Sequence, residues 1–163
     1  MKKLNILFLP LIFATTLSAN DKIYSFIGIQ AASSNIEDTN VPTIGLKYGQ
    51  QSENIRTSLS YNYGKNSNND YHLVIVQMDT GILSNTFTDS SIKPYIGASL
   101  GYMYNKRSGN ENKNGLLYGA NAGLTYIVND SIDLDLGYRF MKANKIDDID
   151  SLNDVTFSMN YFY

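Results

Sequence analysis

Hydrophobic and polar residues alternate strictly along the last part of the chain. From Ser131 onward, apolar residues occupy every second position. These positions are Ile132, Leu134, Leu136, Tyr138 and Phe140, and between them lie Asp133, Asp135, Gly137 and Arg139. After a polar break the pattern returns as Val155, Phe157, Met159, Tyr161 and Tyr163, against Asp154, Thr156, Ser158 and Asn160. A period of two puts one set on each face of a β-strand, so two strands with fully apolar faces are predicted.

Six further stretches have strand-like patterns. They span residues 22–32, 41–49, 55–64, 70–83, 92–105 and 114–128. With the two C-terminal strands they make eight, and each reaches the roughly 9–11 residues that cross an outer membrane at a tilt. The polar connections 33–40, 65–69, 106–113 and 143–150 are predicted to lie together on one side. Which side chains of the first strand face inward is not decided by the pattern, because the adjacent residues Phe26 and Ile27 are both apolar. Gly28 and Gln30 favour even positions facing inward.

The patterns allow two architectures that differ in where the apolar faces point. In a soluble sandwich, or in a periplasmic barrel that binds an apolar ligand, these faces would point inward. In a transmembrane barrel they point outward to lipid. No apolar run after Ala19 approaches the roughly 20 residues of a membrane helix, so a membrane-spanning chain would have to close as a barrel. The continuous apolar faces favour an all-β, eight-stranded antiparallel up-and-down transmembrane β-barrel.

The C-terminal strand resembles the signal of bacterial outer-membrane barrels, in which apolar residues at every second position lead to an aromatic last residue. This assembly signal would comprise Val155, Phe157, Met159, Tyr161 and Tyr163. The phrases PYIGASLGY at 94–102 and LDLGYR at 134–139 resemble those of small opacity-type, OmpA-like outer-membrane barrels. The resemblance implies insertion into outer-membrane lipid with the help of periplasmic chaperones and the barrel-assembly machinery. No peptidoglycan-binding domain is expected, because the last strand ends the sequence.

The first residues have the features of a secretory signal peptide. Lys2 and Lys3 precede an apolar run from Leu7 to Ala14, and small residues surround Ala19. The run is too short for a membrane-anchoring helix. Residues 1–19 are therefore predicted to be cleaved, and residues 20–163 to form the barrel domain.

The composition excludes several classes of function. Cleavage after Ala19 would remove two of 13 basic residues and none of 15 acidic ones, leaving 11 − 15, a net charge of −4. This charge disfavours binding to nucleic acid. The chain has no cysteine, which excludes a lipoprotein anchor, a disulfide scaffold and a thiolate metal site.

The interior of an eight-stranded barrel is just wide enough for side chains to fill, so inward charges must pair. The predicted lumen charge network is Lys47, Arg56, Asp79, Asp133, Asp135, Arg139 and Asp154, with Gln77, Asn62, Asn121 and Asn160. Hairpin registers would place Arg139 opposite Asp154 and Arg56 opposite Asp79. Lys47 would lie beside Arg56, and both would need carboxylates from Asp79, Asp133 or Asp135. The simpler hypothesis is a polar plug that keeps the barrel shut, and the alternative is a gated ion path.

Catalytic and metal-binding patterns are weak. His72 is the single histidine, and no serine lies two residues from it as in lipid A deacylases. The acidic run at 147–150 matches no calcium loop. No catalytic residue, metal or cofactor is predicted. The predicted function is envelope structure, or contact with a host or environmental ligand through short outer loops. A narrow ion channel and a lipid A-modifying enzyme are the alternatives.

Overall fold

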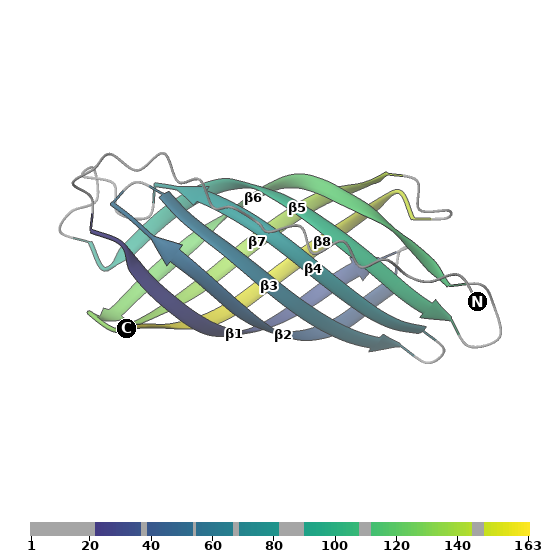
Figure 1. Cartoon of the computed structure of the whole chain (residues 1–163), viewed down its shortest axis with the longest axis horizontal. Coiled ribbons are helices and arrows are strands. Elements are labelled where there is room, and N and C mark those ends of the chain that lie inside the picture. The colour runs from purple at the N-terminus through teal and green to yellow at the C-terminus, as the bar shows by residue number, and fades with distance from the viewer. Residues whose placement is uncertain are drawn as a thin grey trace, which may run out of the picture.

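The computed structural model describes residues 22–36, 39–53, 55–66, 69–81, 90–107, 112–144 and 149–163, and the predicted signal peptide lies outside these ranges. The strands are β1 (Tyr24–Ile36), β2 (Thr39–Gln51), β3 (Ile55–Asn66), β4 (Asn69–Thr80), β5 (Ile92–Arg107), β6 (Lys113–Asn129), β7 (Ile132–Asn144) and β8 (Ser151–Phe162). Consecutive strands pair antiparallel, and β1 also pairs with β8 (Figure 1). The predicted eight-stranded up-and-down barrel is confirmed. None of the described residues forms a helix long and apolar enough to cross a membrane.

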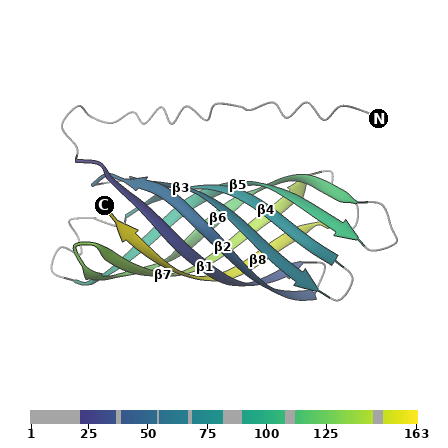
Figure 2. The ribbon, with the colours of Figure 1, turned by 60° about the horizontal axis from the view of Figure 1, so that its bottom comes forward.

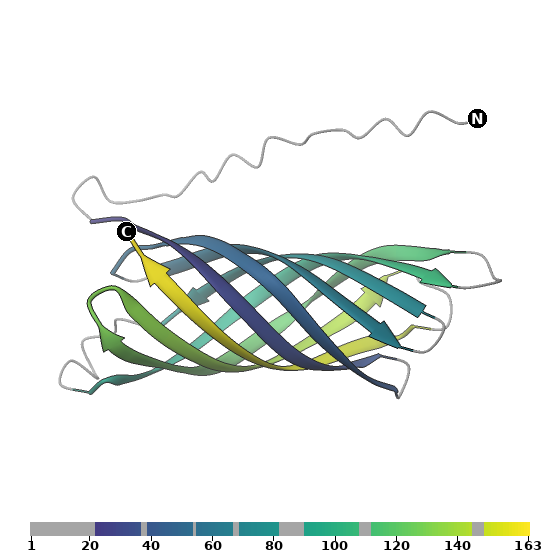
Figure 3. The same ribbon diagram turned by 90° about the horizontal axis from the view of Figure 1, so that it is seen from below.

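The barrel has two distinguishable ends. β1 begins and β8 ends at the same end, which we call the terminal end (Figure 3). The opposite end, where β1 is followed by β2, is called the loop end. Along one side of the barrel β7 pairs with β8 and β8 pairs with β1 (Figure 2). The β1–β8 pairing closes the sheet, and we call it the seam.

The two faces of the sheet have the orientation that the alternation predicted. Leu136 is 54% exposed and Phe157 is 52% exposed, whereas Arg139 is 3% exposed. The same orientation shows that the even positions of β1 face inward, because Ile27 and Ile29 are exposed while Gln30 is buried. The apolar face therefore points away from the barrel and the charged face points into it, as a membrane barrel requires.

The predicted outer connections are wrong in length, because the strands continue into the polar segments. Ser33 to Ile36 still belongs to β1, and Ile36 pairs with Thr39. β3 and β4 likewise extend to an Asn66–Asn69 pair. The strand ends leave residues 37–38, 67–68, 108–112 and 145–150 as connections. Polar residues beyond the apolar band can still form the backbone hydrogen bonds of a β-ladder, so their polarity did not mark where the strands end.

The lumen divides into two halves of different chemistry. All seven predicted lumen charges are buried, and they lie in the terminal half and the middle of the barrel. The loop half instead holds an apolar cluster, which we call the plug: Ile36, Val41, Tyr71, Leu73, Ile75, Met103, Leu117, Met141, Ile149 and Leu152. The prediction of a polar lumen is therefore wrong for the loop half. There, most inward positions are apolar, although Ser34, Thr43 and Asn105 are buried polar residues on the same face.

Two connections at the terminal end also differ from the predictions. The fourth strand ends at Thr80 rather than at residue 83, and Gly81 follows with φ of 99°. A glycine adopts this left-handed conformation without the steric cost that other residues meet. The sixth strand extends to Asn129 rather than ending at residue 128, and the β6–β7 register shifts between Ile127 and Asn129, as at a β-bulge.

Candidate functional site

Arg56 on β3 is the most highly connected charge in the lumen. Its Nε donates a hydrogen bond of 2.6 Å to Gln51 Oε1. Its Nη1 lies 3.0 Å from both carboxylate oxygens of Asp135, and its Nη2 pairs with Asp133. Both carboxylates come from β7, across the lumen from β3. The guanidinium thus uses its planar fork to bind two carboxylates from a strand that is not a neighbour of β3.

Lys47 and two neutral residues complete this group. Lys47 Nζ lies 3.3 Å from Asp135 Oδ2. Asn160 Nδ2 donates to Asp133 Oδ1 at 2.7 Å and to Asp135 Oδ2 at 2.8 Å, and Thr125 donates to Asp135 at 2.7 Å. Two positive charges therefore meet two negative charges. Buried charges are stable only when opposite charges balance them and hydrogen-bond donors satisfy the carboxylate oxygens.

A second ion pair lies farther toward the loop end. Arg139 is opposite Asp154 in the β7–β8 register, as the hairpin pairing predicted. Arg139 Nε donates to Asp154 Oδ2 at 3.0 Å, Nη2 pairs with the same carboxylate, and Nη1 donates to Gln77 Oε1 at 3.3 Å. This pair joins two neighbouring strands, and through Gln77 it also reaches β4.

Asp79 differs from the other carboxylates in its partners. The predicted register is present, because Arg56 on β3 lies opposite Asp79 on β4 in the backbone ladder. The guanidinium nevertheless binds Asp133 and Asp135, and Asp79 accepts hydrogen bonds from Gln77 and Asn121. Lys47 is opposite Ser60 in the β2–β3 register, and Lys47 and Arg56 both bind the Asp135 carboxylate. The sequence thus identified the charges, but it could not assign every partner.

Four inward aromatic residues, Phe26, Tyr71, Tyr95 and Phe162, were not identified as lumen residues from the sequence, and two of them lie beside Arg56. Phe26 on β1 and Phe162 on β8 have ring centroids 5.2 Å apart. The Arg56 guanidinium carbon lies 5.3 Å from the Phe26 centroid and 5.8 Å from that of Phe162. These distances allow cation–π attraction. The even parity of β1 was the signal that could have located Phe26.

His72 faces outward near the loop end, within an aromatic group. Its Nδ1 lies 2.7 Å from the Tyr61 hydroxyl, and its ring is 5.3 Å from that of Tyr63 and 6.1 Å from that of Tyr104. A nucleophile–base–carboxylate arrangement would require a serine and an acid around this imidazole. Among the described residues, the imidazole contacts three tyrosines, and the nearby acid Asp70 accepts a hydrogen bond of 3.1 Å from Tyr63 rather than from the imidazole. Ser67, a serine close to His72 in the sequence, and the acidic residues at 147 and 148 lie outside the described residues.

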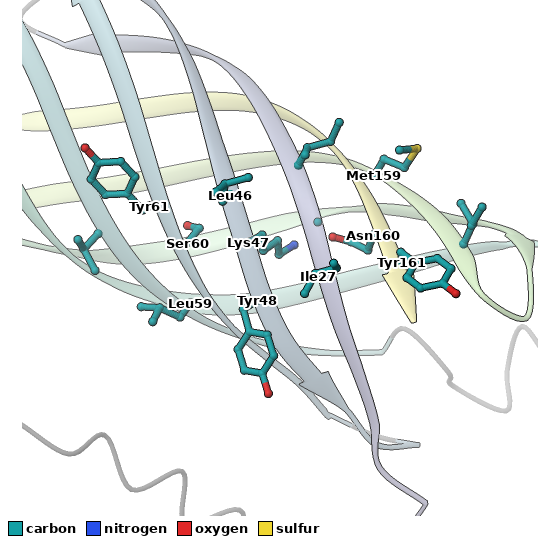
Figure 4. Close-up of a pocket in the computed structure, with 14 residues that line it drawn as sticks. Ile27, Leu46, Lys47, Tyr48, Leu59, Ser60, Tyr61, Met159, Asn160 and Tyr161 are labelled. Atoms are coloured by element: carbon teal, nitrogen blue, oxygen red, sulfur yellow. The ribbon is translucent and has the colours of Figure 1, made fainter. Parts of the chain in front are cut away.

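The residues of the predicted assembly signal form the outward face of β8 and the C-terminal residue. Val155, Phe157, Met159, Tyr161 and Tyr163 are all exposed. Met159 and Tyr161 also line an external apolar groove of about 730 Å³ (Figure 4). A second groove of about 670 Å³ shares Ile29, Leu46 and Met159 with the first and is also lined by Ala31, Ile44 and Phe157. The rows Tyr161–Ile27–Tyr48 and Met159–Ile29–Leu46 flank the first groove.

The lumen offers no evident site for a metal ion. Within the described ranges, no group of three or more His, Cys, Asp or Glu side chains is placed to hold one. The carboxylates there already accept hydrogen bonds from the side-chain nitrogens of arginine, lysine and asparagine and from a threonine hydroxyl. The arrangement is therefore a network of paired charges, in which Asp154 Oδ1 and Asn160 Oδ1 are the buried atoms without a hydrogen-bond partner among the described residues.

The sequence matches a family model described as "Opacity family porin protein" over residues 48–161. This match covers most of the chain and includes both phrases that resembled opacity-type barrels. No curated protein matches the chain.

Several solved structures share the barrel. Neisserial surface protein A is 18% identical with a TM-score of 0.67, over 86% of this chain and 97% of that chain. The N-terminal barrel domain of Pseudomonas aeruginosa OprF is 12% identical with a TM-score of 0.64, over 87% and 100%. The Yersinia pestis outer membrane protein Ail in a phospholipid nanodisc is 19% identical with a TM-score of 0.56, over 87% and 100%. At these identities the likeness shows the fold alone.

Proposed function

Because this chain belongs to the Opacity family of porin proteins and is a barrel of the bacterial outer membrane, we propose that it acts as a closed envelope protein. It contributes to envelope structure or to contacts at the cell surface, and it does not conduct solutes or catalyse a reaction. The observation that carries this proposal is the plug, in which ten apolar side chains fill the loop half of the lumen.

The plug opposes conduction for a physical reason. An ion that crosses the lumen must leave water, and burial of an uncompensated charge among apolar groups costs several kcal/mol or more. Leu73, Met103 and Leu117 are at most 2% exposed, so the lumen at their level is closed to water. Hydrophobic constrictions of this kind block ions even where polar groups line the rest of a path. Among the described residues, the plug therefore interrupts the charged lining between the terminal half and the loop end.

The orientation of the barrel supports a surface role for the loop end. Single-chain barrels of the outer membrane have an even number of strands, which brings both termini to the periplasmic side. We place the terminal end on that side and the loop end at the cell surface. Charged outward residues such as Lys65, Asp70 and Lys106 occur at this rim. With such short connections, a host or environmental partner would contact the strand rims as much as the loops.

The lipid-modifying alternative has weaker support. His72 points outward and shares its hydrogen bond with Tyr61. The tyrosines around it suit a membrane interface, where a ring can be buried while its hydroxyl stays wet. We assign His72 to the aromatic belt. The external grooves lie on the same lipid-facing surface, and we propose that acyl chains of membrane lipids fill them.

Planar-bilayer recording tests the closed lumen. The protein isolated from outer membranes is expected to give no conductance steps. A variant that carries Leu73→Ser, Met103→Ser and Met141→Ser should give steps, because hydroxyls in place of the plug allow water to enter. This variant is the control for successful insertion. Steps of the same size from the unaltered protein would contradict the proposal.

A further inference from the structure

The seam between β1 and β8 is where a barrel closes, because only this pairing joins the two ends of the sheet. Backbone ladders hold it from Phe26–Phe162 to Ile36–Leu152. At the loop end Ile36 and Leu152 also belong to the plug, so apolar packing supports the seam there. The terminal end lies outside the plug and must be supported by other contacts.

The described buried ion pairs between non-neighbouring strands all span this region. Lys47 on β2 and Arg56 on β3 bind Asp135 on β7, and Arg56 also binds Asp133. β2 is the neighbour of β1, and β7 is the neighbour of β8. If the seam opened, β2 and β7 would move apart and these ion pairs would break. The ion pairs therefore oppose opening.

Contacts made by the seam strands themselves add to these ion pairs. Phe26 and Phe162 are register partners across the seam, and Arg56 lies over both rings. Asn160 on β8 donates to both carboxylates of β7. A Cβ at Gly28 would collide with the Asn160 side chain, so glycine on β1 makes room for that amide. Figure 4 shows Lys47 and Asn160 approaching each other from the two sides of β1.

We propose that these groups form a seam latch that holds β8 against β1 at the terminal end of the barrel. The latch comprises Phe26, Lys47, Arg56, Asp133, Asp135, Asn160 and Phe162. It forms when the two edge strands meet, because its cations come from the N-terminal half of the sheet and its anions from the C-terminal half. The latch is independent of the proposed function, since a closed lumen depends on the plug at the other end.

Amide hydrogen exchange of the protein in detergent micelles tests the latch. Arg56→Lys keeps the positive charge but loses the planar fork. The exchange rates of peptides from residues 24–30 and 158–163 are expected to rise roughly tenfold, while those of peptides from the middle of β4 and β5 stay unchanged. Arg139→Lys is the matched control. It alters an equally buried arginine whose carboxylate lies on the adjacent strand nearer the loop end, and it should leave exchange of the peptides from residues 24–30 and 158–163 unchanged.

The possible outcomes separate a latch from general stabilisation. An equal rise in the β4–β5 peptides, or no rise at the seam, would overturn the proposal. If Arg56→Lys fails to assemble while Arg139→Lys assembles, the result supports a role in closure. Asp133→Asn is then the milder probe, because it removes one ionic partner and leaves Asp135 in place. It should raise exchange at the same seam peptides by a smaller factor. Bilayer conductance is measured separately. Conductance reports on the plug and hydrogen exchange reports on the seam, so the failure of one proposal can be told from the failure of the other.

Discussion

A buried arginine in this lumen is stabilised only while its carboxylate stays beside it. Arg139 and Asp154 are 3% and 1% exposed. Arg139→Met would leave a buried carboxylate without its cation, and we expect the free energy of unfolding to fall by about 3–5 kcal/mol. The double variant Arg139→Met, Asp154→Leu should recover most of this loss, because no unpaired charge remains. Urea unfolding followed by tyrosine fluorescence measures both, since the chain has 13 tyrosines and no tryptophan.

The comparison between the single and double variants decides what the pair contributes. If the double variant unfolds as easily as the single one, the ion pair acts through its specific geometry rather than through charge compensation. Leu136→Ala, on the lipid-facing side of the same strand, provides the baseline for a change that leaves the lumen intact.

The partners of individual charges were only partly predictable from the sequence. Parity identified which charges face inward, and hairpin pairing gave the Arg139–Asp154 neighbours. Arg56 could not be assigned in the same way, because its long side chain crosses the lumen to β7. Which strands face each other across a barrel depends on how far the sheet is sheared when it closes. No local pattern contains that information.

At the scale of the strand, β8 has an outward face that contacts lipid and, we propose, is also the signal for assembly. Phe157→Ser should reduce the amount of barrel in the outer membrane several-fold, yet the isolated protein should still refold in detergent. The matched control is Leu136→Ser, because Leu136 is the register partner of Phe157 and is similarly exposed. Cell fractionation with a heat-dependent gel shift measures assembled barrel. An equal loss in both variants would show a lipid-contact effect and no signal.

The existence of every strand could be predicted from the sequence, whereas the strand ends could not. Alternation depends on the pleat, and it holds wherever one face meets lipid. Beyond the membrane both faces can be polar, so SSNIEDTN resembled a loop although most of it is paired. Ile36 within that segment was the missed signal, since a single apolar residue at the inward parity extends the core.

The whole molecule combines two kinds of interior, and each should contribute to the stability of the barrel in a different way. In the terminal half, buried charges provide specific partners. In the loop half, the plug supplies the close apolar packing that soluble proteins have in their cores. A barrel in lipid gains little from its outward apolar face once it is inserted, because lipid and side chains are equally apolar. The plug should therefore provide a large share of the stability against opening.

Truncation of a plug residue tests that expectation on the intact barrel. Met141 is 0% exposed, and Met141→Ala should leave a cavity that lowers the free energy of unfolding by about 2–5 kcal/mol. The temperature at which the SDS gel band shifts from the compact to the extended position should fall accordingly. Leu136→Ala removes a comparable apolar side chain from the outer face, where lipid can refill the space, so its shift temperature should change less. Equal changes in the two variants would mean that the plug packs no more tightly than the surrounding lipid, and stability would then reside in the backbone ladder and the lumen charges.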